Sequence, residues 1–108
     1  MASYDDKLQL LEDHGNRFVC ILFFLARSVR DRRFDADKVY GKLEMKGFDD
    51  QQQARAELIQ DLEQQRLQRI EYDRSTNMVR LTDEGVQWAR KECDKLPYLA
   101  YRDLQNSP

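Results

Sequence analysis

The side chains that could perform chemistry are few in this sequence and stand apart from one another. The single histidine, His14, is expected near a helix end as a capping or surface residue, not as a general base. No serine or cysteine has a local companion of the kind that activates a nucleophile. There is no cluster of His and Cys at metal-ligand spacing and no glycine-rich phosphate loop. The sequence therefore predicts no enzyme, no cofactor and no metal site.

The two cysteines, Cys20 and Cys93, lie in separate apolar helical patterns without the spacing of a disulfide framework. We expect both to be reduced thiols in or near the core of a cytoplasmic protein. The acidic residues at the start of the chain differ from the basic opening of a signal peptide. The longest apolar run, Phe18–Ala26, has nine residues, whereas a membrane-spanning helix needs roughly 20. No membrane partner is expected.

Length and charge limit the class of protein. A chain of 108 residues is expected to form one domain with a modest core. Its formal net charge is −2, from 18 basic and 20 acidic side chains. A strongly basic domain would indicate a nucleic-acid partner, and this balance neither indicates nor excludes one, because local patches matter more than the sum.

The first third of the chain predicts two helices. A short amphipathic helix over residues 4–13 is expected to end at Gly15, with Asn16 as the N-cap of a second helix over Arg17–Arg30. The second helix is apolar on every side. A helix of that kind must be covered on more than one face.

Two further helices are predicted on either side of a short turn. Asp35 is placed to cap a helix over 36–46, and the turn 47–49 contains a glycine, as a helix-turn-helix connection commonly does. The next helix, Asp50–Arg66, begins with a capping box formed by Asp49 with Gln52 or by Asp50 with Gln53. Residues at helical spacing give it an apolar face on a Gln-rich surface: Ala54, Leu58, Ile59 and Leu62.

The hydrophobic period then changes from that of a helix to that of a strand. Apolar and polar residues alternate over 70–73 and again over 79–82, with a turn over 74–77. Thr82 is a suitable N-cap for a last helix from Asp83 to about Asp94. The predicted fold class is mainly α (α+β): N-terminal helices over 1–33, a core over 34–92 with a two-stranded hairpin, and a C-terminal tail over 93–108.

The order helix, helix, glycine turn, helix, hairpin, helix resembles the winged helix-turn-helix superfamily. The run Leu81-Thr82-Asp83-Glu84-Gly85 is similar to the Leu-Thr-x-x-Gly signature that closes the wing in MarR-type and PadR-type transcriptional regulators. Leu58, Leu62 and the run Leu67-Gln68-Arg69-Ile70 resemble the segment that enters the wing. Here Gln65-Arg66 stands where those families often have Lys-Gly, a departure that bears on the helix end and not on the topology.

The resemblance implies a small transcriptional regulator that binds duplex DNA. Carried over by position, helix 50–66 would be the recognition helix and the hairpin 70–82 the wing. Glutamine and arginine are the side chains that read adenine and guanine edges in the major groove. The implied DNA-binding residues are Gln51, Gln52, Gln53 and Arg55 on the helix and Arg74, Ser75, Thr76, Asn77 and Arg80 on the wing.

The charge of the implied recognition helix supports an alternative. From Asp49 to Arg66 there are five acidic and two basic side chains, a net charge of −3, whereas a helix that lies against phosphates usually carries the opposite sign. The alternative is a winged-helix protein–protein interaction module without DNA affinity. The aromatic residues Tyr40 and Trp88 are candidates for an effector pocket, although aromatic residues on an apolar helix face more often belong to the core.

The apolar helix and the tail together predict a homodimer. A winged-helix core covers one side of such a helix, and a contiguous exposed apolar patch usually marks an interface. The regulators that the sequence resembles dimerise through terminal helices and bind two half-sites. The monomeric alternative is a tail that folds back on the same helix. The residues predicted at the dimer interface are Phe18, Leu22, Phe23, Phe24, Tyr98, Leu99 and Tyr101.

Overall fold

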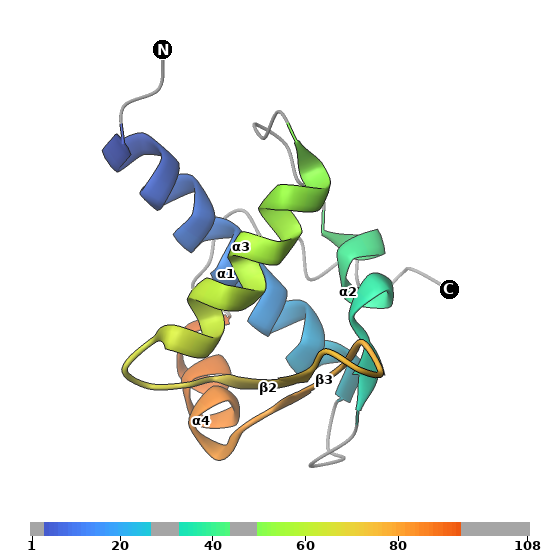
Figure 1. The fold of residues 1–108 in the computed structure, drawn as a ribbon. Helices are drawn as coiled ribbons and strands as arrows, with labels where there is room; N and C mark the ends of the chain where they lie inside the picture. Colours follow the sequence, from blue (N-terminus) through green and yellow to red (C-terminus); the bar gives the residue numbers. More distant parts are fainter. Residues whose placement is uncertain (1–3, 27–32, 44–49, 94–108) are drawn as a thin grey trace.

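The computed structural model describes residues 4–26, 33–43 and 50–93 (Figure 1). Helices predominate in these residues, and the strands form one small antiparallel sheet in the order β1-β3-β2. The described part of the chain is therefore mainly helical with a minor sheet, and none of its helices is long and apolar enough to span a membrane. The elements are α1 (Tyr4–Ala26), β1 (Phe34–Asp35), α2 (Ala36–Lys42), α3 (Gln51–Gln64), β2 (Ile70–Asp73), β3 (Met78–Leu81) and α4 (Asp83–Glu92).

The N-terminal region forms one continuous helix, α1, so the predicted break at Gly15 and Asn16 is wrong. Gly15 is buried, and α1 crosses α3 at this residue. A Cβ atom on Gly15 would lie 3.3 Å from Cδ2 of Leu62 and 3.5 Å from Cδ1 of Leu58. The glycine thus permits a close helix–helix contact and does not end a helix.

The central position of α1 explains why its C-terminal part, Phe18–Ala26, is apolar on every side. The helix contacts α2, α3, α4 and β3 (Figure 1). Phe18 and Leu22, predicted at a dimer interface, are both 0% exposed within the single chain. Phe23 and Phe24 remain half-buried at the surface. One chain therefore covers most of this helix by itself, and α1 belongs to the same core as the segments that follow it.

The predicted hairpin is present, with its second strand shifted by one residue. Ile70 pairs with Leu81 and Asp73 with Met78, which makes β2 and β3 antiparallel around a turn over 74–77. Asn77 has φ 59°, a left-handed conformation that asparagine tolerates better than most residues. The strand β1, which pairs Phe34 with Val79, was not predicted from the sequence. A strand of two residues is too short to show alternation.

Three helix N-caps follow the sequence prediction. The Asp35 side chain accepts a hydrogen bond from the backbone N–H of Asp37, and Asp50 accepts one from Gln53. Thr82 accepts one from Gly85 at the start of α4. Each interaction satisfies a backbone donor that the first turn of a helix leaves without an intrahelical partner.

The prediction that the cysteines are separate reduced thiols is wrong, because Cys20 and Cys93 form a disulfide. Their Cα atoms are 5.7 Å apart, and both side chains are buried. The bond connects the C-terminal half of α1 to the residue that follows α4. Two apolar helical patterns far apart in the sequence meet in one core here, which the spacing alone did not reveal.

Several predicted features lie outside the described residues. They include the end of the second predicted helix at 27–30, the glycine turn at 47–49, and the tail residues Tyr98, Leu99 and Tyr101. The predicted core, 34–92, is described except for residues 44–49.

Candidate nucleic-acid interface

The first turn of α3 presents three consecutive glutamines to solvent. Gln51, Gln52 and Gln53 are all exposed, and Ala56 follows on the same surface. The Gln53 side chain donates to Oε1 of Glu57, one turn later in the same helix, over 3.2 Å. Among the described residues of α3, no large apolar side chain is exposed. The surface is suited to hydrogen bonding and offers no apolar anchor for a protein partner.

Arg55 is held against α2 by an aromatic ring. Its guanidinium carbon lies 4.8 Å from the centroid of the Tyr40 ring, within the range of a cation–π contact. The Tyr40 hydroxyl donates to the backbone carbonyl of Arg55 over 3.1 Å. Burial raises the pKa of Tyr40, so its hydroxyl stays protonated and continues to donate. Arg55 has no carboxylate partner among the described residues, and its buried Nε atom has no hydrogen-bond acceptor there.

The hairpin turn is connected to the last turn of α3 by Arg74. Its guanidinium donates to both carboxylate oxygens of Glu63, over 2.7 and 3.1 Å. These hydrogen bonds raise the pKa of Arg74. The arginine side chain is nevertheless 66% exposed, so the pair lies in contact with water. The hairpin and α3, predicted to act together, are thus joined by an ion pair.

Three of the predicted wing residues differ in their accessibility. Ser75 and Thr76 are exposed at the turn. The carboxylate of Asp73 accepts hydrogen bonds from the Ser75 hydroxyl and backbone N–H, and these lower the pKa of Asp73. Asn77 instead has a structural role: its Oδ1 accepts from the Tyr72 hydroxyl over 2.7 Å, and its Nδ2 donates to Asp35 over 3.0 Å.

Arg80 lies on the outer face of the sheet and is paired across the strands. Its Nη2 donates to Oε2 of Glu71 over 2.6 Å. The Arg80 side chain is 22% exposed, less than its glutamate partner. Arg33, which was not among the predicted site residues, lies beside Arg80. Sequence reasoning missed Arg33 because it missed the short strand that follows it.

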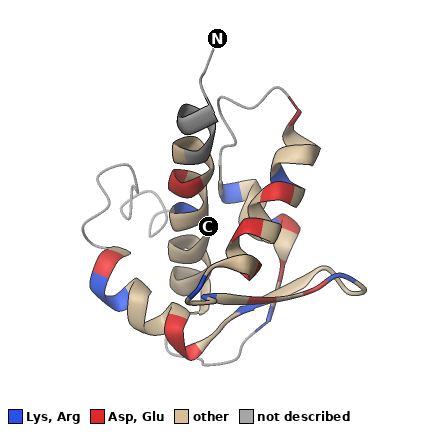
Figure 2. Ribbon diagram, turned by 60° about the vertical axis from the view of Figure 1, so that its left-hand side comes forward, with Lys and Arg blue, Asp and Glu red and all other residues tan. Residues whose placement is uncertain are grey.

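The surface charge around α3 is acidic, as the sequence indicated. Over Asp50–Arg66, four carboxylates outnumber two guanidiniums, and red segments recur along α3 in Figure 2. Two of the three arginines predicted to contact DNA, Arg74 and Arg80, are already paired with glutamates.

The remaining candidates for chemistry are structural. His14 is 4% exposed inside α1, where Nδ1 donates to the carbonyl of Leu10 over 2.8 Å, so the expected position near a helix end is wrong. Tyr40 packs on Phe18 with a ring-centroid distance of 5.4 Å. Trp88 packs under the guanidinium of Arg69 at 4.3 Å. No group of His, Cys, Asp and Glu residues suited to a metal ion occurs in the described ranges.

Comparison of the sequence with protein-family models gives no match, and searches of curated proteins and of solved structures also find none.

Proposed function

We propose that this chain is a small winged-helix protein that binds duplex DNA as a transcriptional regulator, with α3 as recognition helix and the β2–β3 hairpin as wing. The observation that carries the proposal is the exposed first turn of α3, where Gln51 and Gln52 have amide groups able to pair with base edges. Arg55 follows on the same helix without a carboxylate partner among the described residues. The hairpin turn adds Ser75 and Thr76, whose hydroxyls suit phosphate contacts.

The ion pairs on the arginines do not prevent DNA binding. An exposed pair such as Arg74–Glu63 is screened by water and contributes little to stability. A phosphate can replace Glu63 as the partner of Arg74, because the released glutamate is left at the surface and not in the core. The net negative charge of α3 has a different effect. It weakens the sequence-independent part of DNA binding, which depends on neutralisation of the phosphates by basic side chains. Base contacts must then provide more of the affinity.

The DNA proposal predicts different effects for a wing variant and a helix variant. Arg74→Ala should weaken binding to every duplex several-fold and reduce the slope of log affinity against log salt by about 0.9, the contribution of one phosphate contact. Gln52→Ala should instead relax the preference at one base pair. Fluorescence anisotropy on labelled duplexes at about 50 mM salt, a condition that strengthens phosphate contacts, measures both.

The control for both variants is Arg90→Gln, which removes an exposed charge from the last turn of α4. This variant should bind DNA as the wild type does. An absence of binding to any duplex at low salt would reject the DNA proposal.

A protein–protein interaction module is the second candidate, and the acidic surface of α3 favours it. Carboxylates such as Glu57 and Asp61 repel phosphates and attract a basic partner. The same anisotropy experiment separates the two candidates, because a module of this kind leaves labelled duplex DNA unbound at low salt.

We also propose that the protein acts as a homodimer, as two half-sites on DNA would require. Phe18 and Leu22 are fully buried in the single chain, so the proposal now depends on Phe23 and Phe24 of α1 and on the tail. One chain has a mass of 12.9 kDa, and light scattering at micromolar concentration should give twice that mass. Phe23→Ser should shift the protein towards one chain. A single-chain mass that persists on concentration would refute the dimer.

A further inference from the structure

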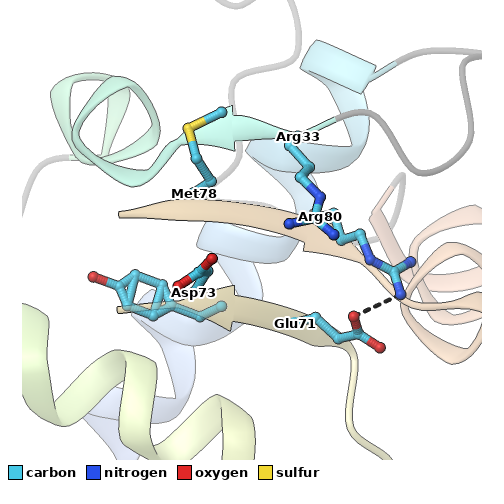
Figure 3. Close-up of a pocket in the computed structure, with 6 residues that line it drawn as sticks. Arg33, Glu71, Asp73, Met78 and Arg80 are labelled. Carbon is cyan, nitrogen blue, oxygen red and sulfur yellow. Dashed lines mark hydrogen bonds and ion pairs between the residues drawn. The ribbon is translucent and has the colours of Figure 1, made fainter. Parts of the chain in front are cut away.

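The outer face of the sheet carries two rows of side chains. Successive residues of a strand point to opposite faces, and Ile70, Val79 and Leu81 are buried. The residues between them therefore point outward. The register places Glu71 opposite Arg80 and Asp73 opposite Met78. Figure 3 shows these four side chains on β2 and β3.

Arg33 extends the first of these rows to the edge of the sheet. Phe34 pairs with Val79 in antiparallel register, so one step along each chain brings Arg33 beside Arg80. Figure 3 shows the Arg33 side chain reaching over β3 towards Arg80. The side chains enclose a shallow cavity of about 80 Å³, lined by Arg33, Glu71, Tyr72, Asp73, Met78 and Arg80.

The carboxylates around this cavity already have partners. Glu71 accepts a hydrogen bond from Arg80 over 2.6 Å. Asp73 accepts two from Ser75, over 2.6 and 2.9 Å, and faces the hairpin turn. Asp35, at the edge of the second row, accepts from Asp37 and Asn77.

Arg33 differs from these groups. It is exposed, and it has neither a hydrogen bond nor an ion pair with any residue that the structure describes. Its row contains two guanidiniums, on Arg33 and Arg80, and one carboxylate, on Glu71. Like charges on adjacent strands repel each other. An anion placed between the two arginines would remove this repulsion.

We propose that Arg33 and Arg80 form a binding site for a phosphate-type oxyanion on the outer face of the sheet. A guanidinium is a planar fork that donates two parallel hydrogen bonds to a phosphate. Adjacent strands are about 4.8 Å apart, so one tetrahedral group can accept two hydrogen bonds from the Arg33 fork and one from Arg80, whose Nη2 also donates to Glu71. Both the DNA backbone and a free phosphorylated molecule supply such a phosphate group, and the site does not depend on the proposed DNA binding.

The first test uses inorganic pyrophosphate and the intact chain. Isothermal titration calorimetry should detect binding to the wild type, and Arg33→Gln should weaken it at least about tenfold, since one charge-assisted fork is lost. Arg33 is the residue to change because Arg80 also pairs with Glu71, whose carboxylate would be left without its partner. Thermal unfolding should confirm that Arg33→Gln folds as the wild type does.

The matched control is Arg90→Gln, which removes the same exposed charge from α4. It should leave pyrophosphate binding unchanged. An equal loss in both variants would mean that net charge is responsible, and would overturn the proposal.

The second test distinguishes the two sources of phosphate. If the site binds the DNA backbone, Arg33→Gln should lower the salt slope of duplex binding by about 0.9. If it binds a free phosphorylated molecule, pyrophosphate binding should depend on Arg33 while duplex affinity does not change. Arg33-dependent pyrophosphate binding without any duplex binding supports the site and rejects the proposed function. The site is rejected if Arg33→Gln changes neither pyrophosphate nor duplex binding.

Discussion

Reduction of the Cys20–Cys93 disulfide is expected to lower the free energy of unfolding by roughly 4 kcal/mol. The cysteines are separated by 73 residues, so the bond closes most of the described chain into one loop. A loop of that length removes a large part of the conformational freedom of the unfolded state. Both cysteines are buried, and the bond also fixes the end of α4 to α1 in the folded state.

Urea unfolding with and without dithiothreitol measures this difference. The double variant Cys20→Ala/Cys93→Ala is the control, because its unfolding midpoint should not respond to the reductant. Thiol titration in denaturant should find no free thiol in the oxidised wild type. Two free thiols in freshly purified protein, together with identical unfolding curves with and without reductant, would contradict the prediction.

The disulfide also changes one argument about the cellular compartment. The prediction of a cytoplasmic protein relied in part on Cys20 and Cys93 being reduced. Structural disulfides persist in oxidising compartments and are rare in the cytosol. With the bond present, the two cysteines no longer indicate a reducing compartment.

Features that depend on neighbouring residues were predictable from the sequence. The caps Asp35, Asp50 and Thr82 each bond to a backbone group two or three residues away. The hairpin follows from a two-residue period on either side of a polar turn. The mainly helical α+β fold class follows from the same local patterns.

Features that depend on distant partners were not predictable in this way. Glycine is common at helix ends, which is why a break was predicted at Gly15. Its actual role is to permit the close contact with Leu58 and Leu62 of another helix. The disulfide requires two patterns to meet across 73 residues. Secondary-structure propensity and hydrophobic periodicity describe the chain within one element. Neither shows which elements pack against each other.

In the candidate site too, features set by neighbouring residues were predictable and contacts between distant residues were not. The sequence placed Arg74 in the hairpin turn and Arg80 on its second strand, where the structure has them. It did not pair Arg74 with Glu63, 11 residues earlier and on another element. The Glu71–Arg80 pair, in contrast, follows from the hairpin register once Ile70 is set opposite Leu81.

Gly85→Ala is expected to destabilise the fold by about 3–5 kcal/mol. A Cβ atom on Gly85 would lie 2.0 Å from the backbone oxygen of Arg69, far inside van der Waals contact. Neither backbone can move freely. The Arg69 carbonyl accepts from the N–H of Thr82 over 3.0 Å, and the Thr82 hydroxyl donates to the carbonyl of Gln68 over 2.6 Å.

A displaced Arg69 backbone would also disturb the contacts of the Arg69 side chain. This side chain is 6% exposed and donates to Asn16 of α1 and to Gln65 after α3, each over 3.0 Å, while its guanidinium packs on Trp88 of α4. Burial lowers the pKa of Arg69, and the negative charges of Asp61 and Glu12 oppose this effect. A shift of the Arg69 backbone would loosen contacts to three helices at once.

The same substitution elsewhere in the chain is the control for this prediction. Gly41 lies exposed in α2, and a Cβ atom there would meet no atom within 4 Å. Gly41→Ala should therefore stabilise the protein by about 0.5–1 kcal/mol, the difference in helix propensity. Urea unfolding of both variants should show midpoints that move in opposite directions. If Gly85→Ala unfolds at the wild-type midpoint, the glycine of the Leu-Thr-x-x-Gly run is not required for the close approach of α4 to Arg69.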